Sequence, residues 1–551
     1  MPDSVIPSTL AEALCRASTY PHAVERIRMI ETHISWVFLT GAYAYKVRKP
    51  VKLGFLDFST LAARRIDCVE ELRLNRRLAP ELYLEVVAIR ASPEGPRVGG
   101  SGVAVEYAVR MRQFPQAALA TGLLAAGALT PELIISFAWR ISAFHAGQQG
   151  VPADSGYGDA ESILHNAREN FEEMGPLLDT DEDRVALEAL RDWTEGEFIA
   201  RRSEIGARRK GGRVRECHGD LHLRNIVLLG DRLVPFDCLE FSAALRWNDV
   251  MSEAAFVAMD LMHLGAPRLA WLFLNAYVEA GGDYAGLSVL RFYMVYRALV
   301  RAKIHLIRAR QACSDPAEAA RLVEGYHSYV RLAAECSSNA AGAIVLMHGL
   351  SGSGKSTVAR ELSLSLAAIR VRSDVERKRL PATLRSARRG SARARSAYTP
   401  AATETTYARL AEAAGAIAQA GYTAIVDAAF LAGAQRKRFR DLARKLDVPV
   451  ALVDLNAPAA QLRERIARRA AQATDPSEAT LDVLEHQIAT AEPIGRDEHL
   501  SIVSVDGCVG LTPRAVAALC LLTCRHCSDW CAASCTVLAT RSSRAPAPAL
   551  T

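Results

Sequence analysis

The segment GLSGSGKS, residues 349–356, constrains the fold of this 551-residue chain more than any other feature. It matches the pattern G-x-x-x-x-G-K-[S/T] at every fixed position, directly after the apolar run AIVLMHG and directly before a helical stretch. In this setting the glycines let successive backbone N–H groups turn toward one anion, and the start of the helix adds the positive end of its dipole. The sequence therefore predicts a strand, a phosphate-binding loop and a helix in direct succession.

The side chains of this loop and two later carboxylates complete a nucleotide site. Lys355 is expected to reach the β- and γ-phosphates, and the Ser356 hydroxyl to hold Mg²⁺. Asp427 ends the β-run AIVD and is the candidate for positioning Mg²⁺ or its water. Asp374 follows the preceding β-run, residues 369–372, and is placed to meet either the acceptor or the metal. Lys355, Asp374 and Asp427 are the predicted catalytic residues of this site. The predicted nucleotide-binding residues of the loop are Gly349, Ser351, Gly352, Ser353, Gly354, Lys355, Ser356 and Thr357.

Changes of pattern along the chain predict two domains, of α+β and α/β class. Residues 31–110 carry short β-runs around one helical segment, and long helical stretches follow up to residue 335. Beyond the polar stretch CSSNAAG, β-runs and helices alternate, which is typical of a parallel sheet with helices on both faces. The predicted parts are a helical extension (1–30), a first domain (31–335), a linker (336–342), a domain with the phosphate-binding loop (343–515) and a disordered tail (516–551).

Composition narrows the class of protein. A chain of 551 residues with 50% hydrophobic residues is long and apolar enough for more than one core. The net charge of +6 is mild and the arginines are scattered, which argues against a dedicated nucleic-acid binder. We see no export signal at the N-terminus and no apolar run of membrane-spanning length, so we expect a cytoplasmic protein that does not contact membranes.

The C-terminal part resembles the small P-loop kinases of the adenylate, gluconate and zeta-toxin type. The resemblance rests on GLSGSGKST, VRSDVERKRL, IVDAAF and the arginine-rich LRERIARR. In such kinases an arginine-bearing lid closes over the phosphates and stabilises the charge of the transition state. The resemblance implies Arg465 and Arg469 as nucleotide-binding lid residues, with Arg436 as a further candidate; an arginine-rich helix surface is the alternative.

A second group of candidate catalytic and metal-binding residues lies in the first domain, in the segment CHGDLHLRN, residues 217–225. Its spacing H-x-D-x-x-x-x-N, followed by an Asp in PFDCLEF, matches the catalytic segment of protein kinases. By that logic Asp220 is the catalytic base, Asn225 and Asp237 are metal ligands, and His218 is structural. Lys46 lies in an upstream β-run, where kinases grip the α- and β-phosphates. Its predicted partner is a helical carboxylate, Glu70 or Glu71, of which Glu71 joins Lys46 as a nucleotide-binding residue.

The first domain is similar to the aminoglycoside phosphotransferase and choline kinase group, over residues 31–335. The resemblance implies a bilobal protein-kinase-like fold and a hinge at Val105–Val109 that holds adenine. The chain departs from the family in two places. It has no G-x-G-x-x-G, so only Thr32–Ser35 or Thr40-Gly41 could cover the phosphates, and D-F-G is replaced by D-C-L.

Other interpretations of these segments stay open. His218 and His222 with Cys217 could bind zinc, although the intervening glycine favours a loop. The first domain could be a degenerate kinase that binds nucleotide or a partner without catalysis. In the tail, Cys524, Cys527 and nearby residues invite a metal interpretation, but the usual two separated ligand pairs are missing, so a poorly ordered appendage is favoured.

The whole chain resembles a bacterial fusion of an aminoglycoside-phosphotransferase-like domain with a P-loop kinase or ATPase domain. The resemblance implies two nucleotide sites, ATP and Mg²⁺ as cofactors, and γ-phosphate transfer to small-molecule acceptors that it does not identify. One alternative is a P-loop ATPase regulator whose first domain is a non-catalytic binding module. Another is a toxin-like kinase that acts on nucleotide sugars.

Overall fold

A computed structural model describes residues 7–53, 56–312, 315–338, 341–380, 400–472 and 480–523. The chain divides into two compact units, Met1–Glu169 with Ile205–Leu261 (unit 1) and Asn170–Glu204 with Met262–Thr551 (unit 2). Three helices have residues in both units: α5 (Ala160–Met174), α6 (Asp181–Lys210) and α8 (Val250–His263). Each unit is described by itself.

The remaining elements of unit 1 are α1 (Pro7–Leu14), η1 (Ala17–Thr19), β1 (Arg28–Glu31), β2 (Ser35–Leu39), β3 (Tyr43–Arg48), β4 (Lys52–Leu53), β5 (Leu56–Asp57), α2 (Leu61–Asn75), β6 (Tyr83–Arg90), β7 (Arg97–Val98), β8 (Ala104–Arg112), η2 (Gln116–Ala118), α3 (Ala120–Ala125), α4 (Pro131–Gly147), β9 (Val214–Glu216), η4 (Leu223–Asn225), β10 (Ile226–Leu229), β11 (Arg232–Pro235), α7 (Ala243–Arg246) and β12 (Trp247–Asp249).

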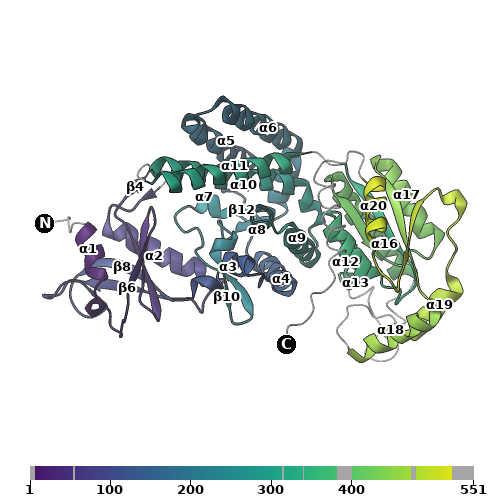
Figure 1. Cartoon of the computed structure of the whole chain (residues 1–551), viewed down its shortest axis with the longest axis horizontal. Helices are drawn as coiled ribbons and strands as arrows, with labels where there is room; N and C mark the ends of the chain where they lie inside the picture. The colour runs from purple at the N-terminus through teal and green to yellow at the C-terminus, as the bar shows by residue number, and fades with distance from the viewer. Residues whose placement is uncertain are drawn as a thin grey trace, which may run out of the picture. The chain divides into compact units, whose positions relative to one another are not determined.

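Unit 1 is built on an antiparallel sheet of order β1-β2-β3-β8-β6-β7. Strand β3 alternates: Tyr45 and Val47 join the cluster that includes α1, so Lys46 between them faces the other side. Helix α2 begins at the N-cap Thr60, whose side chain accepts a hydrogen bond from the Ala63 amide, and it packs beside β6 and β8 (Figure 1). The alternation thus directs Lys46 toward α2.

The elements of unit 2 are η3 (Gly175–Leu177), α9 (Pro267–Gly281), η5 (Tyr284–Gly286), α10 (Leu287–Gln311), α11 (Pro316–Ser337), β13 (Ala343–His348), α12 (Lys355–Ser365), β14 (Ile369–Arg372), α13 (Ser373–Lys378), α16 (Pro400–Gln419), β15 (Thr423–Asp427), α17 (Gly433–Leu446), β16 (Val450–Asn456), α18 (Ala459–Gln472), α19 (Leu481–Thr490), η6 (Arg496–Glu498), β17 (Ser501–Asp506) and α20 (Pro513–Thr523).

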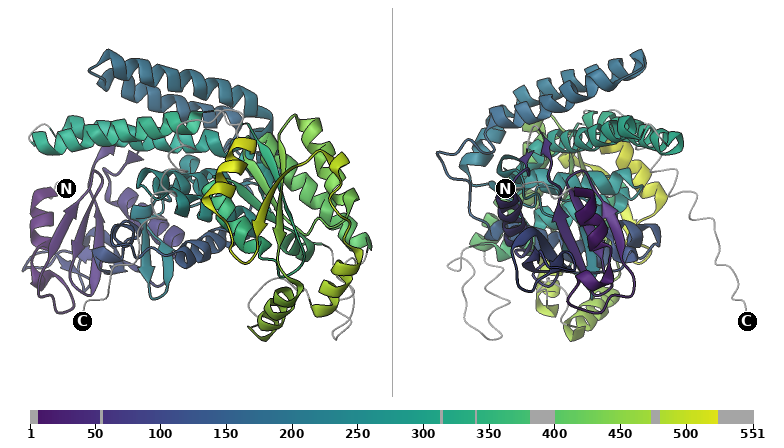
Figure 2. Two further views of the ribbon diagram at one scale, coloured as in Figure 1. Left: turned by 45° about the vertical axis from the view of Figure 1, so that its right-hand side comes forward. Right: turned by 90° about the vertical axis from the view of Figure 1, so that its left-hand side faces the viewer.

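A five-stranded parallel sheet of order β14-β15-β13-β16-β17 forms the centre of unit 2. On one face Val345 and Met347 of β13 pack with residues of α12 and α20. On the other face lie α16 and α17, as the views in Figures 1 and 2 show. All strands run the same way, so the P-loop after β13 and the carboxylates after β14 and β15 meet at one edge.

Helices α9, α10 and α11 belong to the same compact unit as this sheet. Helices α10 and α11 run side by side (Figure 2), while α9 packs against β14 and α12. Strand β14 is an edge strand, and α9 lies beside it. The fold class predicted from the sequence, a kinase-like α+β part followed by a parallel P-loop sheet with flanking helices, is confirmed.

The division into domains stays a prediction, and two of its parts need comment. The first two residues of the predicted linker 336–342 belong to α11, which ends at Ser337, and β13 begins directly after it at Ala343; the compact units divide the chain elsewhere. The tail was expected to begin at residue 516, which is wrong for 516–523, because α20 runs to Thr523 and buries Val516 and Leu519 in the core. The cysteines from Cys524 onward lie outside the described residues.

Candidate active sites

Lys46 lies at the centre of the candidate site in unit 1. Its Nζ donates to Glu71 Oε1 at 2.9 Å and to Asp237 Oδ1 at 2.5 Å. Burial alone would lower the pKa of Lys46, but the carboxylates of Asp237 and Glu71 outweigh burial and raise it. Burial alone would raise the pKa of Asp237, but the Lys46 ammonium outweighs burial and lowers this pKa below its ordinary value. Both groups are therefore charged at neutral pH.

Arg48, two residues along β3, anchors the same cluster from inside. Arg48 is one of the largest fully buried side chains among the described residues. It donates to Glu71 Oε2 and to Ser35 Oγ, each at 2.7 Å, and also pairs with Asp67 and Glu240. The two carboxylate oxygens of Glu71 thus accept from different cations, Oε1 from Lys46 and Oε2 from Arg48. The structure thereby distinguishes the two candidate partners of Lys46, because Glu71 meets it.

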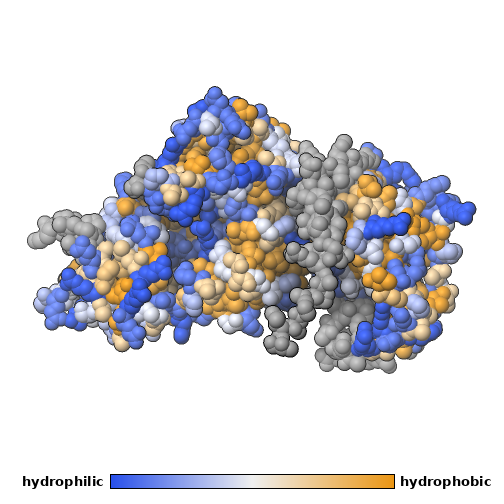
Figure 3. Space-filling view, in the orientation of Figure 1, coloured by the Kyte–Doolittle hydropathy of each residue, from blue (hydrophilic) through white to orange (hydrophobic). Residues whose placement is uncertain are grey.

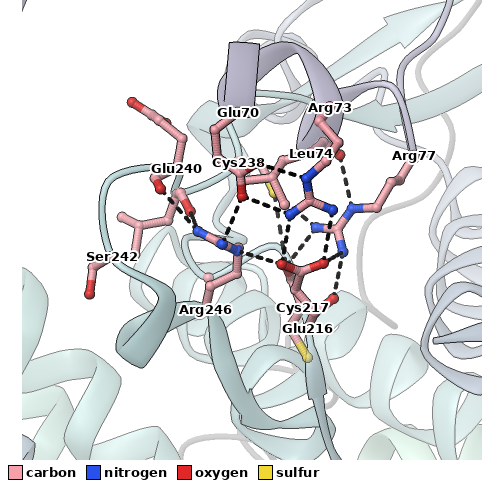
Figure 4. A network of polar contacts seen from close by, with 12 residues as sticks. Glu70, Arg73, Leu74, Arg77, Glu216, Cys217, Cys238, Glu240, Ser242 and Arg246 are labelled. Atoms are coloured by element: carbon pink, nitrogen blue, oxygen red, sulfur yellow. Dashed lines mark hydrogen bonds and ion pairs between the residues drawn. The ribbon is translucent and has the colours of Figure 1, made fainter. Parts of the chain in front are cut away.

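Glu70 takes part in a separate network on the outer side of α2 (Figure 4). Arg246 donates to Glu70 at 3.0 Å and to Glu216 at 3.1 Å, and Arg73 bridges the same two carboxylates. Arg77 adds a hydrogen bond to the Cys217 carbonyl at 3.0 Å. This network ties α2 to β9, so that the helix carrying Glu71 is held against the strand that leads into residues 217–225.

The segment 217–225 places Asp220 and Asn225 together. Asn225 Nδ2 donates to the carbonyl and to Oδ2 of Asp220, each at 3.0 Å, which leaves the amide oxygen of Asn225 as the atom that can bind a cation. Asp237 adopts a positive φ of 61°, unusual for a residue with a side chain, and its amide donates to Tyr83 Oη at 3.0 Å. Asn225 and Asp237 thus offer the oxygen ligands that Mg²⁺ prefers.

A buried carboxylate from α8 supports this segment. Glu253 accepts hydrogen bonds from the Gly219 amide and, at 3.1 Å, from His145 Nε2. Burial would raise the pKa of Glu253, but these hydrogen bonds lower it to about 2. The amide of Leu223 donates to Asp260 of the same helix at 2.8 Å. Neither Glu253 nor Asp260 was assigned this role from the sequence, because nothing in their spacing relates them to residues 217–225.

The geometry bears on two expectations for unit 1, the hinge and the turn that would cover the phosphates. Residues 108 and 109 of the expected hinge pair with both β3 and β6, so their backbone groups belong to the sheet and the hinge assignment is wrong there. The turn Thr32–Ser35 lies between β1 and β2 at the Arg48 end of the sheet, unlike the turn Thr40-Gly41 between β2 and β3. It is therefore the better candidate to cover phosphates.

The zinc interpretation of residues 217–222 is not supported in the described part of the chain. His218 Nε2 lies 2.9 Å from the Phe236 carbonyl, and His222 Nε2 lies 3.3 Å from Asp220 Oδ2. Two groups of buried residues have metal-ligand spacing there, and neither contains His218 or His222. One of them joins Cys217 to His145 and Glu253, whose hydrogen bond is described above. His218 is fully buried, which is compatible with the structural role expected for it.

In unit 2 the P-loop has the backbone geometry that its sequence predicts. Gly349, Gly352 and Gly354 have positive φ angles of 139°, 85° and 96°. A Cβ at Gly349 would lie 2.6 Å from the Leu455 carbonyl oxygen, so only glycine fits there. Gly354 is the N-cap of α12, which places the helix start at the loop.

A cavity of about 690 Å³ opens above this loop. Ser351, Gly352, Gly354, Lys355, Ser356 and Thr357 line it, whereas Gly349 and the buried Ser353 do not. Asp374 and Asp427 also line it, as the ends of parallel strands require. Asp427 is 5% exposed, and its Oδ2 is buried without a hydrogen-bond partner among the described residues. An orphaned carboxylate oxygen in the cavity that Ser356 also lines fits a site for Mg²⁺.

The arginine candidates separate clearly. Arg465 lines the cavity and donates to the Gly352 carbonyl at 3.2 Å. Arg469 belongs to α18, but its side chain lies outside the described part of the chain. Arg436 is not a lid residue, because it is 1% exposed and bonds Glu498 at 2.7 Å and the Phe430 carbonyl at 2.9 Å.

Several residues of the cavity were not assigned from the sequence. Gln487 of α19 accepts a hydrogen bond from the Ser351 amide at 2.8 Å. Arg377 lies 3.5 Å from Asp374, and Arg372 and Arg468 also line the cavity. Arg372 and Arg377 flank Asp374 within VRSDVERKRL, so that segment carried a signal, whereas Gln487 is remote in sequence.

Comparisons with known proteins agree with this description. A family model described as an AAA domain matches residues 344–494. The uncharacterised protein Rv2004c of Mycobacterium tuberculosis is 31% identical over 351 residues, which cover 64% of this chain and 68% of that protein. The uncharacterised protein Mb2027c of Mycobacterium bovis matches with the same values.

Among solved structures, a choline/ethanolamine kinase family protein from Mesorhizobium loti is 12% identical, with a TM-score of 0.35 and coverage of 59% of this chain and 98% of that one. A gluconokinase from Sinorhizobium meliloti is 22% identical, with a TM-score of 0.25 and coverage of 34% and 95%. These scores are low, so the fold assignment rests on the strand orders and contacts given above.

Proposed function

The chain belongs to the same family as these mycobacterial proteins, and on this premise we propose that it is an ATP- and Mg²⁺-dependent phosphotransferase with two nucleotide sites. The observation that carries the proposal is the cavity in which Lys355, Asp374 and Asp427 meet above the P-loop. A phosphate-binding loop alone serves many activities. A loop with a free carboxylate for the metal and a second one for an acceptor has the parts of a kinase.

At the P-loop site the backbone amides and Lys355 would bind the triphosphate. Ser356 and Asp427 would hold Mg²⁺, which neutralises charge on the β- and γ-phosphates when bound. Asp374 would accept the proton of an acceptor hydroxyl or orient it for in-line attack. Arg465, which already contacts the loop, would stabilise the charge of the transferring group.

In unit 1, Lys46 held by Glu71 would bind the α- and β-phosphates, with Asn225 and Asp237 as the metal ligands. Asp220 would be the base, and the hydrogen bond from Asn225 supports its orientation. The acceptors of both sites are proposed to be small molecules. A regulator whose first domain is a non-catalytic binding module is the second candidate, favoured by the absence of G-x-G-x-x-G from the sequence.

The test is ATP turnover of the full chain with Mg²⁺ and a metabolite extract, with phosphorylated products identified by mass spectrometry. Lys355→Ala and Asp220→Ala are compared with the wild type. Exposed residues of the same units provide matched controls, Lys437→Ala and Asp231→Ala. A double kinase loses a different product in each active-site variant. If the extract does not change the rate of ATP turnover and only Lys355→Ala lowers it, the chain is a regulator and not a double kinase.

A further inference from the structure

Glu279 lies in α9, outside the five-stranded sheet, yet its carboxylate faces two arginines of β14. Glu279 Oε2 lies 3.8 Å from Arg370 Nη2, and Oε1 lies 3.6 Å from Arg372 Nη1. All three side chains are 14–15% exposed. One carboxylate thus pairs with two guanidinium groups in a largely buried place, where charges interact more strongly than in water.

Arg370 connects Glu279 with the metal side of the P-loop site. Arg370 Nη1 donates to the carbonyl of Ser356 at 3.1 Å, at the start of α12. Burial lowers the pKa of Arg370, while the nearby carboxylates of Asp427 and Glu279 oppose this. Arg370 therefore lies within the electrostatic reach of Asp427, the residue with an orphaned oxygen.

Arg372 connects Glu279 with the acceptor side. It lines the cavity, is the N-cap of α13 and precedes Asp374 by two residues. In the sheet its Cα is the register partner of Asp427. A guanidinium at this position can turn toward either carboxylate unless another anion holds it, and Glu279 is such an anion.

Asn275, one helical turn before Glu279, holds the edge of the same strand. Its Oδ1 accepts from the Arg370 amide at 2.7 Å, and its Nδ2 donates to the Ala368 carbonyl at 2.9 Å. The side-chain amide thereby satisfies edge groups that a further strand would otherwise pair with. Asn275 and Glu279 lie four residues apart, so the same face of α9 hydrogen-bonds the backbone of β14 and pairs with its two arginines.

We infer that Glu279 is a positioning residue of the P-loop site, which acts through Arg370 and Arg372. It keeps their positive charges paired away from Asp427 and Asp374, so that these carboxylates stay available to Mg²⁺ and to the acceptor. The inference rests on the proposed function for its meaning, since it assigns to α9 a part in phosphoryl transfer. It adds a component that the P-loop segment by itself does not contain.

The experiment measures how much Mg²⁺ the P-loop site needs to bind ADP, by titration calorimetry of the full-length protein at a series of Mg²⁺ concentrations. Every variant is made in an Asp237→Ala background, which removes a proposed metal ligand of the other nucleotide site. In Glu279→Gln two arginines lose their anion, and the Mg²⁺ concentration at half effect should rise about tenfold, or about 1.4 kcal/mol. Glu279→Asp should recover part of the loss. Glu361→Gln is the matched control, since Glu361 of α12 pairs with Arg268 of α9 at 2.9 Å but is exposed.

Hydrogen exchange of residues 341–380 separates this effect from a general loosening of the fold, because a positioning role predicts little change outside 368–378. A Mg²⁺ requirement in Glu279→Gln equal to that in Glu361→Gln overturns the inference. ADP binding does not depend on turnover, so the inference can stand or fall separately from the kinase proposal. If no acceptor is ever phosphorylated while Glu279→Gln still shifts the Mg²⁺ requirement, the kinase proposal alone fails.

Discussion

Glu253 illustrates how a residue outside a motif sets the geometry of that motif. It is 1% exposed and bonds both the Gly219 amide and His145. The sharp backbone at Gly219, with φ of 91°, leaves an amide that needs an acceptor, and a carboxylate on α8 supplies it. The position of Asp220 thus depends on a carboxylate 33 residues later in the chain.

The depressed pKa of Glu253 predicts a pH dependence. Its pKa is about 2 in the folded state, against about 4.3 in an unfolded chain, so its stabilisation is complete above pH of about 4.3 and is lost as the pH falls toward 2. Glu253→Gln should lower the free energy of unfolding by about 3 kcal/mol at pH 7, with a difference that shrinks below pH of about 4.3. Urea unfolding across this pH range, with residues 217–225 followed by hydrogen exchange, measures it.

The exposed Glu132 of α4 gives the control variant, Glu132→Gln, which should change stability little at any pH. A pH-independent difference between Glu253→Gln and the wild type would mean that the hydrogen bonds to Glu253 do not favour its charged form.

At the scale of elements, α20 shows that the P-loop core extends further along the chain than its motifs do. The helix covers β16 and β17, and Ala515, Val516 and Leu519 are buried with Val453 and Val503 of the sheet. The sequence LTPRAVAALCLL is apolar on one side, but the cysteine-rich residues after it suggested a tail. Burial of three apolar side chains corresponds to several kcal/mol.

Truncation tests this element. A chain ending at Leu511 should lose the cover of β17 and unfold unit 2 at a lower temperature, because the apolar face of the sheet becomes exposed. A chain ending at Thr523 keeps α20 and should melt like the full chain. Differential scanning calorimetry of both distinguishes the outcomes. Equal melting of the two truncations would show that α20 contributes nothing to the core.

At the scale of the whole molecule, each compact unit contains one complete candidate site. Lys46, Glu71, Asp220 and Asp237 all belong to unit 1, and the P-loop with its carboxylates belongs to unit 2. The visible face mixes hydrophilic and hydrophobic residues, with hydrophilic ones prominent where α5 and α6 lie (Figure 3). Within the described residues no helix has the length and apolar character needed to cross a membrane.

This arrangement predicts two separately stabilised transitions on heating. Mg²⁺ with ADP at about 100 times its Kd should stabilise each unit by about 2.7 kcal/mol. Lys355→Ala should abolish the shift of one transition and Asp237→Ala the shift of the other, as measured by calorimetry. If Asp237→Ala leaves both shifts intact, unit 1 does not bind nucleotide, and the non-catalytic alternative gains support.

The sequence by itself determined the sites in which the functional residues are close neighbours along the chain. The P-loop and the segment 217–225 could be recognised because their glycines and polar residues must follow a fixed local order to fold as they do. The alternation of strands and helices likewise determined the parallel sheet. In each of these the contacts that matter are made within a few residues.

Only the tertiary structure decided which distant side chains meet. It assigned Glu71 instead of Glu70 to Lys46, since the two adjacent carboxylates leave α2 in different directions and meet different partners. It placed Arg436 in a buried ion pair with Glu498 and brought Glu279 beside β14. Which charges are buried and paired depends on contacts between residues that lie tens to hundreds of positions apart, and a local sequence pattern does not predict such contacts.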